Sequence, residues 1–522
     1  MNNKILITNN TALRQKYGSS LTKIQEAIKR LVSADKARGI NTRAIAVDKR
    51  QDMTAVRGEV VTNAADPRQN KNAVDAIYKA LLPDYIVLLG SIDIIPHQDL
   101  HNPLYDPNSV DDGDPDEFAF GDIPYACEAP YSQEPKDFIG PTRVVGRIPD
   151  ISNQSNADYM VRLLDVAAKW SSRDAHDYLQ YFGISAEVWR KSTATSLQNT
   201  FGSNSDLQVC PPNGPRWEHS LLSRLSHFIN CHGASSSPVF YGQPVGRDVY
   251  PDAHLATWIN GRTSSGTIVA AECCYGSELY NPAPVKNRQI GICSTYLVNG
   301  AYGFFGSTTI AYGPAEGNGT ADLISQYFLQ QVIAGSSLGR AALEARQRFA
   351  QSSSSIGPDD IKTLAQYTLL GDPSIQPVSK PKLHEAVELV RRMRKVASPS
   401  QMIVEQRAAD RRRLFTAGIN IGKTQPVAER RSAKAAPHSI AVTLKKMARA
   451  EGVLSPAILS FDIGRPRFAS KRAAFAERIS APTAFHVAIG RSHRDELVNQ
   501  IVLIVAMEQR GTIISLRKLQ SR

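Results

Sequence analysis

The sequence is poor in cysteine and lacks long hydrophobic runs. Its 522 residues include six cysteines, two of them adjacent, which make a poor framework for disulfides. We therefore expect free thiols in a reducing compartment. The apolar run at residues 5–7 is too short for a secretory core, which needs roughly 7–15 residues. The run at residues 501–507 is far below the roughly 20 residues that span a bilayer. These absences predict a cytoplasmic protein without a membrane span.

Positive charge is concentrated at one end of the chain. The formal net charge is +12, but residues 379–522 hold 28 Lys+Arg against 11 Asp+Glu, a net of +17, and residues 1–378 carry −5. This asymmetry predicts a separate basic C-terminal module of mixed α and β structure at 379–522. Its charge is explained equally well by a solvated surface or by binding to nucleic acid or to an acidic protein, such as an activator.

Short apolar strands alternate with helices in the rest of the chain. Residues 4–8, 44–47, 85–89, 143–145 and 181–185 read as strands, and residues 13–37, 72–82, 156–170 and 218–225 read as helices. Strands that are apolar on both faces predict a mostly parallel sheet with helices on both faces. We expect an N-terminal α/β subdomain at 1–150 and a catalytic subdomain at 151–378. In the C-terminal module, a helix at 383–396 and a hairpin at 500–516 are the clearest elements.

A histidine and a cysteine pair follow two of the later apolar runs. His232 ends the stretch 227–233, and Cys273 and Cys274 end the stretch 267–276. Loops at the carboxyl ends of parallel strands meet on one edge of a sheet, which brings a base and a thiol together. A cysteine nucleophile needs such a base to take its proton. The backbone N–H of Gly233 and that of the nucleophile itself are the expected donors to the oxyanion.

These residues are also open to other interpretations. A His or Cys at a strand end is often a packed core residue. A zinc site would use Cys231, His232, Cys273 and Cys274, but adjacent cysteines fit a tetrahedral site badly. An acidic stretch at 106–122 reads as a solvated loop, with calcium as the alternative ligand although the spacing is not that of an EF-hand. The calcium candidates are Asp111, Asp112, Asp114 and Asp116.

Several stretches in order resemble the gingipain-like cysteine peptidases, a family with a caspase-type fold. The resemblance covers roughly residues 84–378. It rests on LLGSIDIIP (88–96), DDGDPDEFAFGD (111–122), VVGRIPD (144–150), NCHG (230–233), AAECCYG (270–276), GAYGFFGST (300–308), SLGRAALEA (337–345) and LLGDPSI (369–375). It implies His232 as general base and acid, and a cysteine of the ECCYG stretch as nucleophile. The spacing to the glycine favours Cys274, with Cys273 as the alternative, and Glu187 is the candidate that orients the histidine.

The resemblance implies an endopeptidase that acts on proteins through a Cys-His dyad and an acyl-enzyme, without a required cofactor. Arg-specific gingipains carry an acidic residue shortly after the Glu, but residues 188–204 contain none. Arg or Lys at P1, the residue before the cleaved bond, is therefore not implied, and an acidic or apolar P1 stays open. If basic P1 residues were accepted, the clusters at 411–413 and 430–431 would be self-cleavage sites.

Gingipains are exported, whereas this sequence favours an intracellular, bacterial-type enzyme regulated by its C-terminal module or a partner. The alternative is a catalytically silent scaffold whose basic module binds nucleic acid or an acidic protein. A third reading is an acyltransferase or ligase that uses the same acyl-enzyme.

Overall fold

The computed structural model of the chain describes residues 2–109, 112–379, 399–431, 435–464, 482–494 and 498–522. A ten-stranded sheet forms its centre. In spatial order the strands are β2 (Ile40–Ala46), β1 (Asn2–Thr8), β3 (Tyr85–Leu89), β6 (Val145–Ile148), β16 (Tyr367–Leu370), β14 (Gly303–Ser307), β13 (Ile268–Ala271), β9 (Ser226–Asn230), β7 (Tyr181–Ala186) and β8 (Leu207–Cys210). The mixed α/β architecture with a large, mostly parallel sheet is confirmed.

One antiparallel contact divides the sheet into two parallel halves. Neighbouring strands are parallel everywhere except between β14 and β16. The strands from β2 to β16 therefore run opposite to those from β14 to β8. As a result, the carboxyl ends of β7, β9, β13 and β14 share one edge, where loops are free to carry function.

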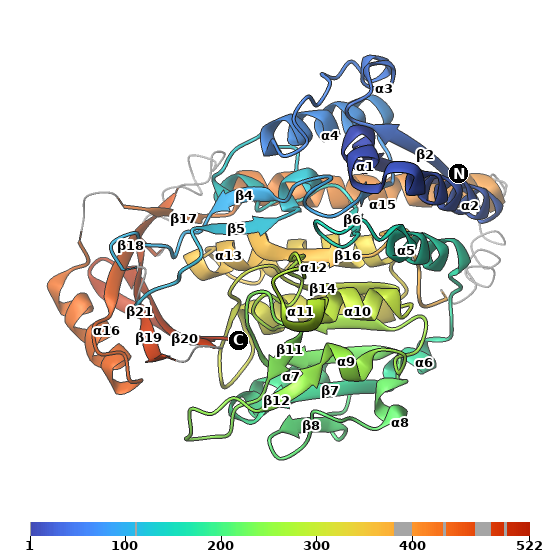
Figure 1. Cartoon of the computed structure of the whole chain (residues 1–522). Helices are drawn as coiled ribbons and strands as arrows, with labels where there is room; N and C mark the ends of the chain where they lie inside the picture. Colours follow the sequence, from blue (N-terminus) through green and yellow to red (C-terminus); the bar gives the residue numbers. More distant parts are fainter. Residues whose placement is uncertain (1, 110–111, 380–398, 432–434, 465–481, 495–497) are drawn as a thin grey trace.

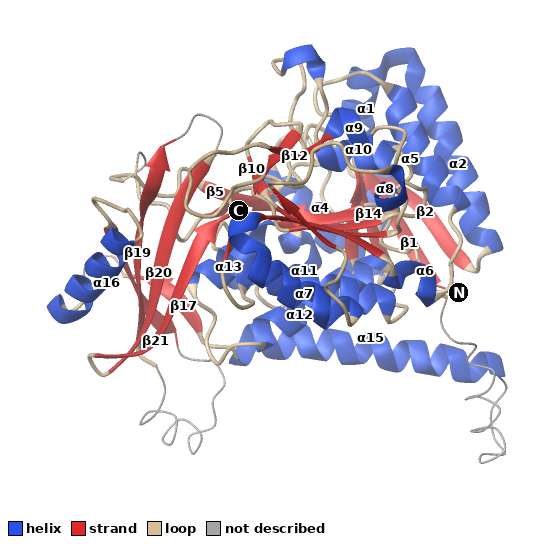
Figure 2. Cartoon of the chain, turned by 90° about the horizontal axis from the view of Figure 1, so that it is seen from below, coloured by secondary structure: helices blue, strands red, loops and turns tan. Residues whose placement is uncertain are grey.

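Helices cover both faces of the sheet (Figure 2). One face carries α1 (Asn10–Tyr17), α2 (Leu21–Ala37), α5 (Ala157–Lys169), α9 (Ala256–Ile259) and α10 (Ile292–Val298). The other carries α7 (Arg190–Phe201), α11 (Thr320–Ile333), α12 (Leu338–Gln351) and α13 (Pro358–Gln366), with α15 (Pro399–Thr424) outside them. The remaining helices of the body are α3 (Arg50–Ala55), α4 (Pro67–Leu81), α6 (Ala175–Leu179) and α8 (His219–Leu222).

The helices follow local signals in the sequence. The buried residues of α2 are Leu21, Ile24, Ala27, Leu31 and Asp35, a helical spacing that faces the sheet. Helix α4 begins five residues earlier than we predicted, because proline suits the first helical position and the preceding Asp accepts a backbone N–H as N-cap. The predicted helix at 218–225 is wrong in length, since α8 has only four residues.

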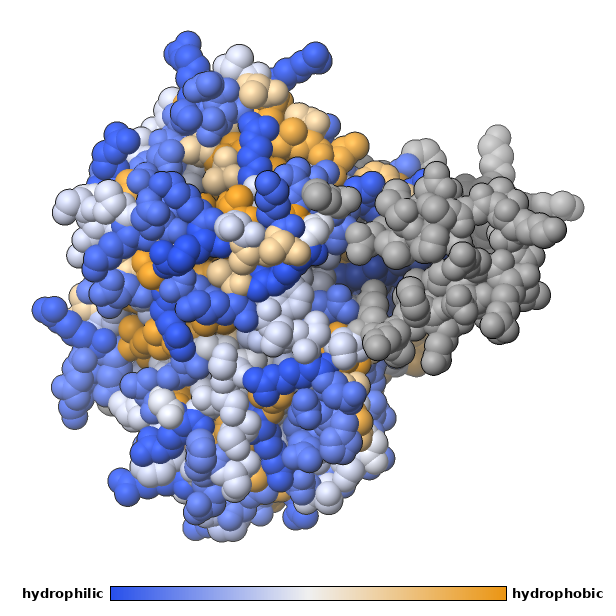
Figure 3. Space-filling view, turned by 90° about the vertical axis from the view of Figure 1, so that its right-hand side faces the viewer, coloured by the Kyte–Doolittle hydropathy of each residue, from blue (hydrophilic) through white to orange (hydrophobic). Residues whose placement is uncertain are grey.

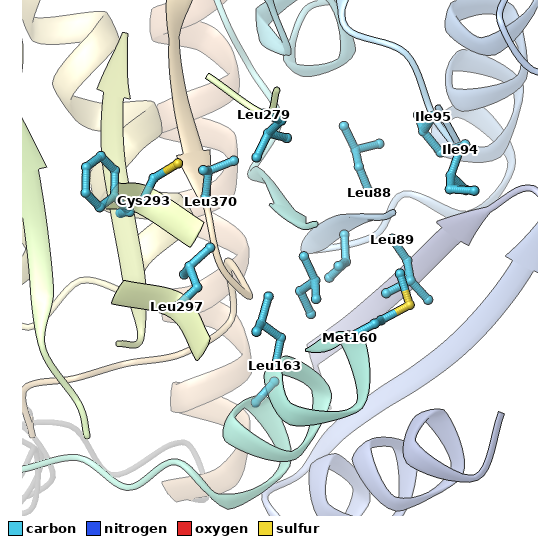
Figure 4. Packing of buried hydrophobic residues seen from close by; sticks show 14 of the residues in the cluster. Leu88, Leu89, Ile94, Ile95, Met160, Leu163, Leu279, Cys293, Leu297 and Leu370 are labelled. Atoms are coloured by element: carbon cyan, nitrogen blue, oxygen red, sulfur yellow. The ribbon is translucent and has the colours of Figure 1, made fainter. Parts of the chain in front are cut away.

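One hydrophobic core joins the two predicted subdomains. Leu88 and Leu89 of β3, Leu163 of α5 and Leu297 of α10 belong to the same buried cluster (Figure 4). At the surface, hydrophilic residues cover most of the face shown in Figure 3, and apolar ones lie in small groups between them. The body therefore packs as one unit around the sheet.

Two short hairpin systems lie beside the main sheet. One is formed by β4 (Gln98–His101) and β5 (Phe118–Gly121), on either side of the acidic loop. The other is formed by β10 (His232–Gly233), β11 (Val239–Tyr241) and β12 (Asp252–Leu255). The second system carries one of the two predicted catalytic loops.

The C-terminal residues form a sheet of their own that is joined to the body. Its antiparallel strands, in spatial order, are β15 (Tyr312–Gly313), β21 (Thr512–Ser521), β20 (Asn499–Gln509), β19 (Ala484–Arg494), β18 (Ala457–Gly464) and β17 (Val427–Arg430), and α16 (His438–Ala450) packs on it. The predicted hairpin is confirmed as β20 and β21. The predicted helix at 383–396 lies outside the described residues.

The sequence predicts a separate module here, but this sheet is joined to the body. Its first strand, β15, comes from the body, and β17 lies beside Ile356 of the body. Arg517 of β21 forms ion pairs with Asp359 and Asp360 of α13. The last strand leads the chain from this sheet into the body, where the C-terminal end lies in Figures 1 and 2. The structure thus places residue 522 inside the region predicted to be catalytic.

Candidate active site

His232 is held by one ring nitrogen and free at the other. It follows β9 directly, and its ring lies between the rings of Trp189 and Tyr250, at centroid distances of 4.3 and 5.1 Å. Its Nε2 is 2.8 Å from Oε1 of Gln243, while Nδ1 has no hydrogen-bond partner among the described residues. Because Gln243 Oε1 can only accept, Nε2 carries the proton and Nδ1 is the basic nitrogen.

Burial keeps this imidazole neutral. The side chain is fully buried, which lowers the pKa of His232 to about 3, although the bond to Gln243 acts in the opposite direction. The nearby Arg522 guanidinium lowers this pKa further. A neutral imidazole with a free Nδ1 can accept a proton from a neighbouring thiol.

The loop that follows β13 touches the histidine loop. A Cβ placed on Gly233 would lie 1.8 Å from the carbonyl oxygen of Cys274, so only glycine allows this approach. The Cys274 Sγ accepts a hydrogen bond from the Ala311 N–H at 3.3 Å. Burial raises the pKa of the Cys274 thiol to about 12, so it is protonated in the present state. The two strand-end loops thus meet, as the edge position of their strands predicts.

The two adjacent thiols have different surroundings. Cys273 belongs to the same buried cluster as Cys231 and Ile229, and its Sγ lies 3.8 Å from the Ile229 carbonyl oxygen of β9. Cys274 belongs to the cluster on the other side, with Ala311. Burial raises the pKa of Cys273 well above its ordinary value. Cys274 therefore has the position beside the histidine loop, and Cys273 packs toward the neighbouring strand.

The backbone of Arg522 lies in the space between the two loops. Its carbonyl oxygen accepts hydrogen bonds from the N–H of Cys274 at 3.1 Å and from the N–H of Gly233 at 3.3 Å. Its own N–H donates to the Ala311 carbonyl oxygen at 3.0 Å. The preceding residue, Ser521, pairs antiparallel with Tyr312. A backbone carbonyl oxygen therefore occupies the point where the N–H groups of a strand end and of a histidine loop converge, which is the geometry of an oxyanion hole.

The side chain of Arg522 fills a buried pocket with an acid at its end. Its Nη2 lies 3.0 and 3.2 Å from the carboxylate oxygens of Asp322, and neither side chain is exposed. Nη2 also donates to the Pro314 carbonyl oxygen at 2.8 Å, and the guanidinium stacks on Trp189 at 4.5 Å. These contacts combine an ion pair with a cation–π interaction, which suits arginine better than lysine.

The wall and floor of this pocket are shaped for a guanidinium. A Cβ on Gly313 would lie 2.2 Å from Nη2 of Arg522, so glycine leaves the space that the group fills. Beyond Asp322 lies the fully buried Glu272, whose pKa is raised well above its ordinary value by burial and by the Asp322 carboxylate. Burial and the neighbouring Asp322 carboxylate therefore both favour the protonated form of Glu272.

The other predicted candidates have different partners. One carboxylate oxygen of Glu187 accepts the N–H of Val245 at 3.1 Å. Among the described residues, no hydrogen bond joins Glu187 to His232, whose ring is oriented by Gln243. The orienting role of Glu187 thus has no direct hydrogen bond to support it here.

The acidic loop is bound by protein groups. Asp114 contacts Lys362 and accepts the Tyr312 hydroxyl, and Asp116 accepts the Tyr275 hydroxyl and the N–H of Ile310, both at 2.8 Å. These bonds fix the loop beside the residues that follow Cys274. Asp111, another calcium candidate, lies outside the described residues, and Asp112 is at their edge.

The described residues offer neither a metal site nor a membrane-spanning helix. Among residues 2–109, 112–379 and the later described segments, no group of three or more His, Cys, Asp or Glu side chains is arranged to hold a metal ion. The proposed zinc ligands Cys231, His232, Cys273 and Cys274 are accordingly not gathered around one point. None of the helices that the structure describes is both long and apolar enough to cross a bilayer.

Four residues of this arrangement were not identified from the sequence. Gln243, Asp322, Gly313 and Arg522 lie on four separate elements, and each comes to the site only through the fold. Asp322 had one local signal, an acid in the first turn of the largely apolar helix α11. Burial of an unpaired acid is costly, so such a residue calls for a positive partner.

Residues 232–378, which contain His232, Cys274 and Asp322, match the sequence model of a family described as "Peptidase family C25". No curated protein matches the sequence. A solved structure described as "Structure of Protease" is similar with a TM-score of 0.46 and 11% sequence identity, over 99% of this chain and 97% of that chain. The family match confirms the resemblance to gingipain-like cysteine peptidases.

Proposed function

We propose that this chain, whose residues 232–378 match the model of peptidase family C25, a family of cysteine peptidases, is an endopeptidase that cleaves proteins after arginine. One observation carries the proposal. The carbonyl oxygen of Arg522 is bound by the N–H groups of Cys274 and Gly233 while its side chain pairs with Asp322. This is how a P1 arginine and its scissile carbonyl would bind.

The residues support attack by Cys274 with His232 as base. The Cys274 thiol gives its proton to Nδ1 of His232, and the sulfur forms a bond to the scissile carbonyl carbon. The carbonyl oxygen becomes an oxyanion that accepts from Gly233 and Cys274. His232 then protonates the leaving amine, the C–N bond breaks, and a thioester remains. Water, deprotonated by His232, hydrolyses the thioester and restores the thiol.

Gln243 has a positioning role in this scheme. By accepting a hydrogen bond from Nε2–H at a nitrogen–oxygen distance of 2.8 Å, it fixes the tautomer that leaves Nδ1 basic. A carboxylate in this place would stabilise the imidazolium more strongly. The neutral amide therefore suits a base that stays uncharged until the thiol transfers its proton.

Asp322 supports arginine as the P1 residue. No acid lies in residues 188–204, where the comparison with Arg-specific gingipains placed it, but Asp322 of α11 supplies the charge from a different element. An acidic P1 side chain would be repelled by this carboxylate, and an apolar one would leave it buried without a partner. The six cysteines, all free, support an intracellular location, which stays a proposal.

The test compares three variants on a peptide substrate with arginine at P1. Because Arg522 fills the site, all of them are made in an Arg522→Ala chain. We expect Cys274→Ala and His232→Ala to lower kcat by about 10³-fold or more, since the members of a catalytic unit each cost that much. Cys273→Ala is the matched control and should keep the parent rate. Equal rates for Cys274→Ala and its parent would refute the proposal.

A further inference from the structure

We propose that the tip of β21, residues Gln520 to Arg522, inhibits the active site of its own chain by binding there as a substrate does. This inference rests on the proposed function and adds its regulation. Self-inhibition gives the basic C-terminal region a specific role, because arginines of that region pair with acidic residues in the body of the same protein.

The backbone of the tip pairs with a strand of the body. Ser521 and Gln520 pair antiparallel with Tyr312 and Gly313, so the chain enters the site as an added strand. Strand addition of this kind uses main-chain bonds for affinity and a side-chain pocket for specificity. Here the main-chain bonds lead directly to the carbonyl of Arg522 in the oxyanion hole.

The tip also closes the site to other peptides. Arg522 is fully buried, and its guanidinium contacts Asp322, Trp189 and Pro314. A second arginine side chain cannot enter while this one is present. His232 and Cys274 are both buried in this state, which is consistent with a site from which bulk water is excluded.

The rest of β21 is anchored independently of the site. Arg517 is paired with Asp359 and Asp360, and Leu519 is buried in the core. Strand pairing between β20 and β21 extends from Gln509 to Val502, where its partner is Gln520. Ser521 and Arg522 lie beyond that pairing, and the Ser521 hydroxyl accepts the N–H of Ile501 at 2.9 Å. Arg522 can therefore leave the site while the sheet behind it stays folded.

An intramolecular ligand of this kind binds strongly even when its own affinity is modest. A tethered segment has an effective concentration of about a few mM. A peptide with the affinity of an ordinary substrate, near 0.1 mM, would then occupy the site in more than about nine molecules of ten. Release of the tip should raise the rate on a small peptide about tenfold or more.

The first experiment compares the intact chain with Arg522→Ala and with Lys518→Ala as control. Lys518 lies on the same strand, carries the same charge, and pairs with Glu451 outside the site. We expect kcat/KM for a P1-arginine peptide to rise at least tenfold in Arg522→Ala and to stay unchanged in Lys518→Ala. If Arg522→Ala is no faster than the intact chain, self-inhibition is wrong.

Arg522→Lys covers the case in which the alanine variant is poorly folded. It keeps the charge near Asp322 but has a different side-chain shape and loses the planar guanidinium that stacks on Trp189. We expect a rate between those of the intact chain and Arg522→Ala. A rate equal to that of the intact chain would contradict the proposal.

The second experiment adds the tip back as a free peptide. The hexapeptide Arg-Lys-Leu-Gln-Ser-Arg, which has the sequence of residues 517–522, should inhibit Arg522→Ala competitively. The same peptide ending in alanine should inhibit at least tenfold more weakly. Equal inhibition by both peptides would overturn the inference.

The two proposals fail in different ways. If the intact chain and Arg522→Ala cleave P1-arginine peptides at the same rate, the peptidase stands and self-inhibition falls. If folded Arg522→Ala cleaves no such peptide and its Cys274 does not react with an arginine-based probe, the proposed function falls and self-inhibition falls with it.

Discussion

Replacing Asp322 by Asn in the Arg522→Ala chain would remove the charge that we expect to bind a P1 arginine, with little change in shape. In the structure the carboxylate lies 3.0 and 3.2 Å from the guanidinium of Arg522, and both side chains are fully buried. Removing one partner of such a pair costs about 3–5 kcal/mol. Each 1.4 kcal/mol corresponds to a factor of ten, so kcat/KM should fall about 10²- to 4 × 10³-fold.

The neighbouring Glu272 sets the lower end of this range. Its pKa is raised by burial and by the charge on Asp322, so removal of that charge lets Glu272 ionise more readily. Asp322→Asn should therefore lose about 10²-fold, because Glu272 supplies part of the missing charge. The double variant with Glu272→Gln should lose about 10³-fold. Glu272→Gln alone should lose less than about tenfold.

The assay compares substrates that differ only in P1 charge. Citrulline has nearly the shape of arginine but no charge, so the ratio of kcat/KM for arginine to that for citrulline reports the ion pair alone. We expect Asp322→Asn to lower this ratio by about the same 10²-fold and to leave the citrulline rate within about threefold. An unchanged ratio in a folded variant would refute the assignment of Asp322 to the P1 pocket.

Three further predictions concern the rest of the site and the core. Gln243→Leu should lower kcat about 10- to 100-fold with little change in KM, because His232 loses the bond that fixes its tautomer; a wild-type kcat would count against this role. Gly313→Ala should raise KM for P1-arginine substrates about tenfold, because the added Cβ would lie 2.2 Å from the position that Nη2 of Arg522 occupies. An unaltered KM would contradict this prediction. Burial lowers the pKa of three histidines, His227, His232 and His254, to about 3. Their rings therefore stay neutral in the folded state, whereas in the unfolded state they gain protons below pH 6.5. The free energy of unfolding should therefore fall by about 2 kcal/mol for each histidine between pH 7 and pH 5 in urea titrations, and equal midpoints at both pH values would disprove this.

Much of the fold could be predicted because its signals are local. The continuous apolar run at Tyr85–Leu89 gave the strand β3 with its bounds, and the spacing of Leu21, Ile24 and Leu31 gave the buried face of α2. The turn at 509–511 gave the hairpin of β20 and β21. The predicted length of helix α8 is too great, since a short apolar pattern does not show where a helix ends.

The site was only half predictable, for a physical reason. His232 and Cys274 follow their own strands, and the carboxyl ends of parallel strands meet at one edge, so their meeting follows from the sequence pattern. Asp322, Gln243 and Arg522 reach the site from a helix, a loop and the last strand. Their arrival depends on tertiary packing, which no spacing in one sequence encodes.

The C-terminal region is basic, and some of the acidic groups that its arginines bind belong to the body of the same chain. Arg517 pairs with an acid of α13, and Arg522 pairs with one of α11. Arg411 pairs with Asp84 in the N-terminal half of the chain. Net charge predicts that a region associates with an acidic surface without identifying that surface. Part of the positive charge that suggested a separate module for binding nucleic acid or an activator is therefore neutralised within the chain.

The most direct test of the account is to label the Arg522→Ala chain with a peptide acyloxymethyl ketone that carries arginine at P1, and to map the modified residue by mass spectrometry. The account predicts a thioether on Cys274, abolished by His232→Ala and unaffected by Cys273→Ala. Labelling of Cys273 instead, or equal labelling by a probe with aspartate at P1, would contradict it.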